Sequence, residues 1–318
     1  MDAEAQGAGQ WLVAACAAGE LDLPLPGSGR TLDRFRRLAR LGAADPVQAR
    51  LGEGHADAIA ILRELNGPAG DEHVWGVWAA RPDSLRARYV DGSWSVTGER
   101  AWCSGAGTCT RALLTARAED GVRLFVVDPA EVGVDAVKDS WNAVGMVASD
   151  TRTIRFTATP AWPVGRPGAY TERPGFWHGG IGVAACWYGG AVGVAGPLVR
   201  AAGDDPHALA HLGAVDAVLS SAGTLLARAA AEIDAQPTRD LGHRARQVRA
   251  VVEQTATDVL NRVGRALGAG PLGHDRAHAQ RVADLTVYLR QSHAERDLAE
   301  LGALAVARPH PESAWELT

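Results

Sequence analysis

The chain has 318 residues, of which 47% are hydrophobic, and its formal net charge is −5. This length allows two or three packed units with a sizeable core, and the slightly acidic balance argues against a nucleic-acid-binding protein. The four cysteines follow neither metal-ligand nor disulfide spacing, which is typical of a reducing compartment. No run approaches about 18 uninterrupted apolar residues, so we expect a cytoplasmic protein that does not enter a membrane.

Residues 1–70 predict an N-terminal helical domain. Thr31 is the expected N-cap of a helix over 32–41, and apolar residues recur at helical spacing over 49–65. The second of these helices contains Gly52-Glu53-Gly54-His55. Glycine lowers helix stability, so two glycines here indicate that something approaches the helix closely. Glu53 and His55 are two residues apart and cannot share a face, so only one of them is expected to meet a ligand; the alternative is a solvated helix end.

Residues 71–160 predict a central β domain. A cluster of turn residues at 66–70 ends the helical part. After it the apolar period changes to two, which is the period of half-buried strands. Seven short strands with turn signals between them predict a barrel or a sandwich. The expected strands are 74–78, 87–90, 93–97, 112–116, 122–127, 134–137 and 153–157.

The segment 92–118 carries the most chemistry. It begins as a strand, and Gly98 is placed where a tight turn is expected. Trp102 offers a flat apolar wall, Ser104 offers a hydroxyl, and Gly105 lets backbone approach a ligand closely. Together they predict contact with the edge of a planar ring, although a buried hairpin with a core tryptophan would have the same residues.

Residues 161–318 predict a C-terminal four-helix bundle. A connector rich in proline, glycine and aromatic residues covers 160–176, and 181–198 is an apolar helix with many glycines. Such glycines indicate close helix–helix contact in a buried bundle. Further helices are expected over 208–233, 244–267 and 279–304, with a loop over 268–273. The fold class is therefore α+β: N-terminal helical domain, small central β-barrel domain, C-terminal four-helix bundle.

Two segments resemble the acyl-CoA dehydrogenase superfamily. Residues 98–104 resemble its flavin-facing G-x-K-x-W-I-T-N segment, with Trp102 on the family's tryptophan and Ser104 on its threonine, whose hydroxyl bonds the flavin near N5. Residues 145–151 resemble its G-x-x-x-S-x-T segment, and the order of the three units is the same. The resemblance implies an FAD cofactor, pairing of subunits into a homo-oligomer, and an acyl thioester substrate on coenzyme A or an acyl-carrier protein.

The chain also departs from this family. The family's T-E-P-x-x-G-S-D segment falls near 80–84, where Pro82 matches and Ser84 takes the place of the serine. The R-x-x-F-G segment, through which one subunit touches its partner's flavin, has no counterpart between 194 and 216. FAD binding therefore depends on Trp102 and Ser104, with Gly105 and Ser84 as further candidates.

The catalytic base is the largest departure. The family's glutamate falls near 288–293 or, in a subgroup, near 179–180, and neither place has a glutamate. His293 and His178 stand there instead, and histidine can act as a base near neutral pH. We rank His178 first, because a nearby helix N-terminus would disfavour its imidazolium form. His293, Glu53 and His55 follow.

Three functions remain open. The first is a flavin-dependent oxidoreductase that oxidises an acyl thioester. The second is a monooxygenase of the same fold that uses reduced flavin and oxygen. The third is a non-redox protein that binds a ligand or partner through a degenerate flavin site. Flavin uptake separates the third from the first two.

Overall fold

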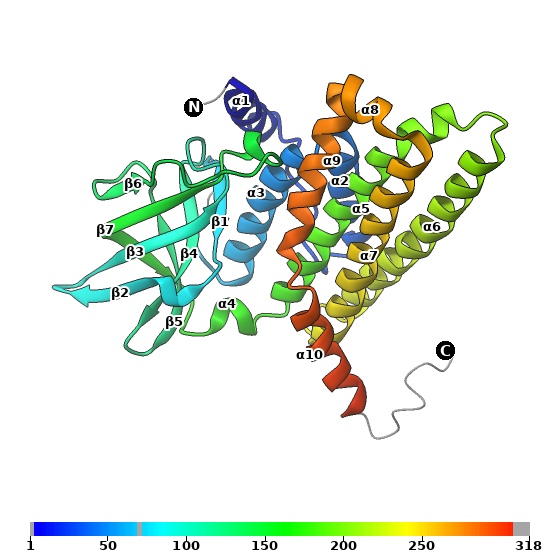
Figure 1. The fold of residues 1–318 in the computed structure, drawn as a ribbon. Coiled ribbons are helices and arrows are strands. Elements are labelled where there is room, and N and C mark those ends of the chain that lie inside the picture. Colours follow the sequence, from blue (N-terminus) through cyan, green and yellow to red (C-terminus); the bar gives the residue numbers. More distant parts are fainter. Residues whose placement is uncertain (1–2, 69–71, 308–318) are drawn as a thin grey trace.

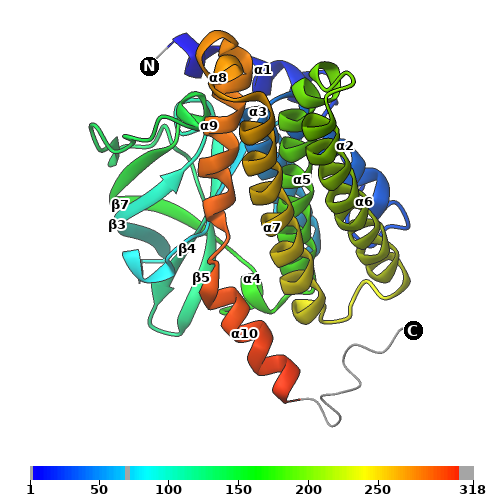
Figure 2. The same cartoon turned by 45° about the vertical axis from the view of Figure 1, so that its right-hand side comes forward.

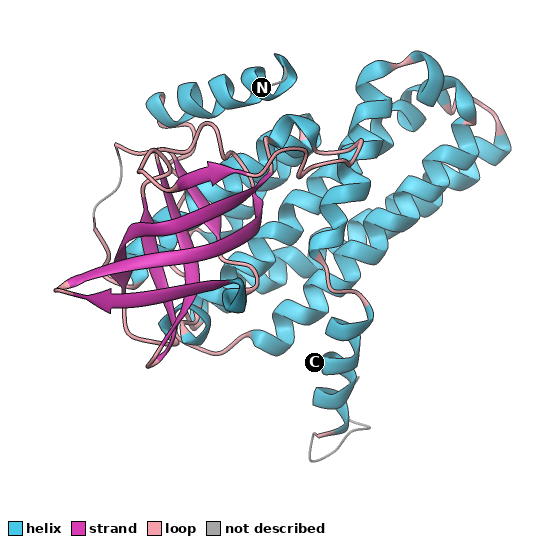
Figure 3. Cartoon of the chain, turned by 60° about the vertical axis from the view of Figure 1, so that its left-hand side comes forward, coloured by secondary structure: helices cyan, strands magenta, loops and turns pink. Residues whose placement is uncertain are grey.

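The computed structural model describes residues 3–68 and 72–307, so Ala69 and Gly70 of the expected domain boundary lie outside the described residues. A helical N-terminal part is followed by a β domain and then by a second, longer helical part (Figure 1). The strands form one curved layer and the helices gather on one side of it (Figure 3). The α+β fold class expected from the sequence is confirmed.

The N-terminal helices are α1 (Ala3–Ala17), α2 (Thr31–Ala44) and α3 (Pro46–Glu64). Asp45 caps α3, because its carboxylate accepts hydrogen bonds from the N–H groups of Val47 and Gln48. The prediction that Thr31 is the N-cap of α2 is wrong, since Thr31 is the first residue of that helix. Asp234 of the later helix α6 (Pro206–Ala235) caps α2 instead: it accepts hydrogen bonds from the Thr31 N–H at 3.0 Å and from the Thr31 hydroxyl at 2.6 Å.

The prediction of seven strands is confirmed. They are β1 (Trp75–Trp78), β2 (Leu85–Val90), β3 (Ser93–Cys103), β4 (Arg111–Ala118), β5 (Gly121–Val127), β6 (Val134–Ala136) and β7 (Arg152–Val164). The order is β1-β4-β2-β3-β7-β5, and a further pairing of β4 with β5 closes a barrel. The turn expected at Gly98 is wrong: β3 continues through it, and Gly98 pairs with both Leu85 and Phe156. Its φ of 132° and the backbone of Ser84 beside it leave no room for a side chain.

The outer face of the barrel positions α3. Strand β4 is buried on both faces, because Leu114 belongs to the main core whereas Leu113 packs in a second cluster with Ile61 and Leu62 of α3. Helix α3 therefore lies along the β domain, with its other face toward the C-terminal helices.

The C-terminal part consists of α4 (Ala169–Glu172), α5 (Gly175–Ala201), α6 (Pro206–Ala235), α7 (Gly242–Leu267), α8 (Ala269–His274), α9 (Arg276–Tyr288) and α10 (Glu295–Val306). The loop expected over 268–273 is therefore largely helical. The single helix expected over 279–304 is broken after Tyr288, where a short 3-10 helix (Leu289–Gln291) leads into α10. Helix α10 extends away from the bundle (Figure 2).

Close packing of α5 against α2 confirms the interpretation of its glycines. A Cβ at Gly189 would collide with the backbone of Ala39, and a Cβ at Gly42 would collide with the backbone around Cys186. Among the described residues, α5 and α6 are both long and apolar enough for a membrane span. Helix α5 is the buried centre of the bundle, with 67% of its most apolar window buried, whereas α6 buries only 17%.

Replacing Gly189 by alanine should lower the free energy of unfolding by about 1–3 kcal/mol, because the added methyl group forces α2 and α5 apart. Gly264→Ala on α7 is the matched control. Nothing lies within 4 Å of its Cβ position, so alanine should raise stability by about 0.5–1 kcal/mol. Urea unfolding of both variants measures the two signs, and equal effects would contradict the close contact.

Candidate active site

The end of β3 presents Trp102 and Ser104 at an irregular edge of the barrel. The register against β7 shifts between Arg100 and Cys103, and Trp102 has a φ of 67°. The Trp102 ring is 52% exposed and meets Trp141 edge-on, with ring centroids 5.8 Å apart. This side chain therefore has an open face, unlike the core tryptophan of a buried hairpin.

Ser104 is buried and ends a chain of hydroxyl groups. Thr151 Oγ1 lies 2.9 Å from Ser104 Oγ and 2.7 Å from Ser149 Oγ. Each hydroxyl has one proton, and the Ser149 proton goes to the Met146 carbonyl at 2.6 Å. The single Thr151 proton therefore serves either Ser149 or Ser104. When it goes to Ser104, the Ser104 proton is available to a group beside it; when it goes to Ser149, Ser104 donates to Thr151 and can only accept a further hydrogen bond.

A small cavity borders Ser104. Its walls come from α3, from β1 and from the loop after β3, and they comprise Arg50, Leu51, Gly54, Trp75, Gly76, Val77, Ser104 and Cys109. It has room for about one water-sized group. A Cβ at Gly54 would lie 3.0 Å from Arg50 Nη1, so the glycine in α3 makes room for the Arg50 head group. The close approach expected at this part of the helix is made at Gly52 by Leu21, Leu41 and Trp11, and at Gly54 by Arg50 of the same helix.

Arg50 forms a buried ion pair with Glu53, with Nη1 and Oε2 3.1 Å apart. Burial raises the pKa of Glu53 to about 7, although the charge of Arg50 acts in the opposite direction. Arg34 of α2 and Arg249 of α7 also lie close enough to favour the ionised carboxylate, and Asp57 opposes it. Glu53 is thus a buried carboxyl group poised near neutral pH.

One buried donor beside this ion pair, the Trp187 indole N–H, has no hydrogen-bond partner within residues 3–68 and 72–307. The Tyr288 hydroxyl is also buried, and its side-chain hydrogen-bond neighbour is the Cys186 thiol. Their rings meet edge-on at 6.4 Å, and the Arg249 guanidinium lies 4.6 Å above the Trp187 ring. Tyr288 lies within electrostatic range of Arg50, Glu53 and Cys186, and burial raises its pKa well above the usual value. We call Arg50, Glu53, Trp187, Arg249 and Tyr288 the polar cluster.

His55 faces away from the polar cluster. It is buried, and its Nδ1 accepts a hydrogen bond from the Trp75 N–H at 3.2 Å. The two acid–base candidates on α3 therefore have different neighbours. His55 faces β1, and Glu53 faces the bundle.

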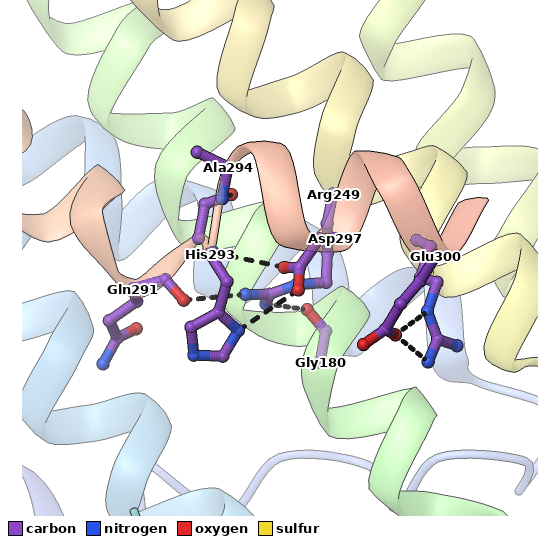
Figure 4. A network of polar contacts seen from close by, with 9 residues as sticks. Gly180, Arg249, Gln291, His293, Ala294, Asp297 and Glu300 are labelled. Carbon is purple, nitrogen blue, oxygen red and sulfur yellow. Dashed lines mark hydrogen bonds and ion pairs between the residues drawn. The ribbon is translucent and has the colours of Figure 1, made fainter. Parts of the chain in front are cut away.

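The two first-ranked histidines lie elsewhere. His178 was expected just before the first bundle helix but lies within the first turn of α5, and burial lowers its pKa. Its charged neighbours are Glu64, Arg173 and Asp234, none of which belongs to the polar cluster. His293 lies just before α10, where its ring is 58% exposed and its Nδ1 is 3.2 Å from Asp297 (Figure 4).

Arg249 links the polar cluster to the segment that carries His293. It donates to the carbonyl groups of Gly180 and Gln291 (Figure 4). These bonds fix the break between α9 and α10.

The remaining cofactor candidates are Gly105 and Ser84. The Gly105 N–H donates to the Ser149 carbonyl at 2.8 Å, and Cys109 fills the space that a side chain would need. Ser84 is exposed at the end of a 3-10 helix (Pro82–Ser84) and is not part of the cavity wall.

The sequence reasoning did not identify Arg50 or Tyr288. A signal for each was present: Arg50 precedes Glu53 by three residues, the spacing of neighbours on a helix face, and Tyr288 is the tyrosine near the family's Y-E-G-T position.

No protein-family model matches the sequence, and a search of curated proteins finds no match. Solved structures do match over nearly the whole chain. TdsC from Paenibacillus sp. A11-2, in complex with FMN and indole, is 17% identical with a TM-score of 0.78, covering 97% of this chain and 98% of its own. The 3-HSA hydroxylase from Rhodococcus sp. RHA1 is 16% identical with a TM-score of 0.77, covering 96% and 93%.

Butyryl-CoA dehydrogenase from Megasphaera elsdenii is 14% identical with a TM-score of 0.76, and the match covers 86% of this chain and 81% of that enzyme. A steroid acyl-CoA dehydrogenase, Tcur3481-Tcur3483, is 16% identical with a TM-score of 0.78 over 94% and 88% of the two chains. Dehydrogenases and a hydroxylase thus share this architecture. The chain has the acyl-CoA dehydrogenase fold.

Proposed function

We propose that this chain is a flavin-dependent oxidoreductase whose active site lies between α3, the end of β3 and the C-terminal bundle. The observation that carries the proposal is that one cavity is bordered both by Ser104 and by Arg50, the ion-pair partner of Glu53. Ser104 lines this cavity, whereas the carboxyl group of Glu53 is not part of its wall and is connected to it through Arg50.

The residues at this edge fit a flavin in chemistry. Ser104 has a hydroxyl that can bond a ring edge, and Trp102 has an open aromatic face. The cavity itself takes only a group the size of one water, so no more than the edge of a ring could enter it beside Ser104. A bound flavin would supply a two-electron acceptor. The resemblance favours FAD, whereas FMN is the flavin named for TdsC.

We further propose that the substrate is an acyl thioester, on coenzyme A or an acyl-carrier protein. Oxidation of such a substrate needs a base for the α-proton, and a base works best when its pKa is near the working pH. Glu53 meets this requirement. This favours a dehydrogenase over the monooxygenase alternative, which needs no such carboxylate, and it moves Glu53 above His178 and His293 as the base.

We also propose that the chain forms a homo-oligomer through its bundle. Helix α6 is apolar over a long stretch but mostly exposed. Leu209 on α6 and Val199 near the end of α5 are 45% and 61% exposed. Covering such a surface with a second copy removes apolar area from water.

Purified protein mixed with excess FAD or FMN and then desalted should retain flavin absorbance between about 350 and 500 nm. Trp102→Ala and Ser104→Ala should each weaken flavin affinity about tenfold or more, since a lost hydrogen bond or ring contact is worth about 1–1.5 kcal/mol. Trp162→Ala is the matched control, because this β7 tryptophan is 49% exposed but is not part of the site. Protein that retains neither flavin would contradict the proposed function.

The raised pKa of Glu53 makes apo-protein stability depend on pH. The pKa of Glu53 is higher in the folded chain than in the unfolded chain, so the folded state keeps the proton up to a higher pH. This preference stabilises the folded state fully below about pH 4.5, and the stabilisation is lost as the pH rises to about 7. The loss is roughly 3 kcal/mol. Urea unfolding across this range should show a fall that Glu53→Gln removes. Glu99, in an exposed pair with Arg155, is the control, and Glu99→Gln should show the wild-type dependence of stability on pH. The same dependence in all three proteins would show that Glu53 does not cause it.

Light scattering at micromolar concentration should give the mass of a dimer or a larger oligomer. Leu209→Arg should shift the protein toward monomer, because it places a charge within the apolar surface of α6. Val132→Arg, on the β domain and 89% exposed, is the control and should leave the mass unchanged. A monomeric wild-type protein would rule out this assembly.

A further inference from the structure

We propose that Trp141 is a second wall of the ring-binding site at the end of β3, and that helix α9 sets the position of this wall through Asp284. The inference rests on the proposed function and deepens it, because it names a residue that seats the flavin ring and a positioning residue that acts through the chain. The sequence reasoning singled out neither of them.

Trp141 and Trp102 form an aromatic corner. Their ring planes stand at 87° and their centroids are 5.8 Å apart. Rings in this arrangement attract each other, because the positive edge of one meets the negative face of the other. Trp102 is 52% exposed and Trp141 is half-buried, so the pair is accessible from outside. A planar ring that stacks on one of these tryptophans can therefore meet the other edge-on.

Trp141 lies in a segment that needs outside contacts to hold its shape. Residues 137–146 connect β6 to a short 3-10 helix (Val147–Ser149) and contain no helix or strand. Asp139 and Met146 have φ angles of 51° and 58°, in the left-handed region that residues other than glycine rarely adopt. The Trp141 indole N–H donates to the Gly145 carbonyl at 3.3 Å. The position of the ring therefore depends on where Gly145 is held.

Helix α9 holds the end of this segment at two successive residues. Asp284 is buried, and its carboxylate accepts hydrogen bonds from the Met146 N–H and from the Gln280 side chain. Hydrogen bonds to an ionised acceptor are stronger than those between neutral groups. A Cβ at Gly145 would lie 2.1 Å from the Ala283 carbonyl oxygen, so the two backbones are in direct contact. The wall formed by Trp141 is thus fastened to the bundle.

The same segment leads on to Ser104. The Ser149 carbonyl accepts a hydrogen bond from the Gly105 N–H at 2.8 Å, and Thr151 Oγ1 lies 2.9 Å from Ser104 Oγ. One attachment to α9 therefore positions both the aromatic corner and the hydroxyl at the ring edge. Binding sites depend on such supporting contacts, because a shift of about 0.5 Å already loosens them.

The first test measures flavin affinity by titration of flavin-free, full-length protein with FMN and with FAD. Trp141→Ala should weaken binding about three- to tenfold, whereas Trp141→Phe, which keeps an aromatic ring, should stay within about twofold of wild type. Trp162→Ala is the control and should leave the affinity unchanged, because this exposed tryptophan lies outside the corner. Wild-type affinity in Trp141→Ala would overturn the proposed wall.

The second test asks whether α9 positions the corner. Near-ultraviolet circular dichroism reports the fixed packing of aromatic rings, so flavin-free Trp102→Ala and Trp141→Ala should alter the same tryptophan band. Asp284→Ala should alter this band too, although both tryptophans remain, and should weaken flavin binding at least as much as Trp141→Ala. Asp284→Asn keeps an acceptor oxygen for the Met146 N–H and should behave more like wild type in both measurements.

The outcomes separate this inference from the proposed function. Urea unfolding identifies a variant that is simply unfolded, and Trp141→Phe and Asp284→Asn then carry the comparison. An unchanged tryptophan band in folded Asp284→Ala would overturn the role of α9. Wild-type protein that binds flavin while Trp141→Ala binds it equally well would refute this inference alone, whereas wild-type protein that binds no flavin would refute the proposed function as well.

Discussion

The buried ion pair between Arg50 and Glu53 is the constraint on which the candidate site depends. Charges removed from water lose several kcal/mol of hydration, and an ion pair regains this only with good geometry and additional hydrogen bonds. Here the pair is incomplete, because Arg50 has one hydrogen-bond partner in the described part of the chain and the nearby Trp187 indole N–H has none there. An apolar pair of similar size would pack more simply at this junction. The polar groups therefore need a reason beyond stability, and a ligand that accepts their free hydrogen bonds supplies one.

The rest of the fold keeps water away from this pair. Helix α3 is held between two surfaces: Leu113 and its neighbours on the barrel pack against one side, and the bundle covers the other. The bundle in turn is drawn tight because Gly42 and Gly189 let α2 and α5 touch backbone to backbone. Tight packing lowers the local dielectric response. Burial, rather than a neighbouring anion, therefore has the largest influence on the pKa of Glu53.

Local patterns in the sequence predict much of this structure, whereas contacts between distant segments do not follow from it. The change from a period of about 3.6 to a period of two marks the β domain, and the Trp102-to-Ser104 segment lies at its edge as a ring-binding segment would. The cap of α2 escaped prediction because Asp234 lies about 200 residues from Thr31. The surroundings of Glu53 could not be predicted for the same reason: Arg34, Arg249 and Tyr288 lie on three other helices, far from Glu53 in the sequence.

The break between α9 and α10 explains why a base has to come from α3 in the proposed mechanism. Tyr288 belongs to the polar cluster, but the chain after it forms a 3-10 helix and places His293 at the surface. Arg249 fixes this path through the Gln291 carbonyl. His178, at the subgroup's position, has Glu64, Arg173 and Asp234 as its charged neighbours instead. Of the four acid–base candidates, Glu53 alone joins the polar cluster, where it lies within electrostatic range of Tyr288. Proton transfer constrains where the carboxylate lies relative to the substrate, and it leaves open which element supplies it.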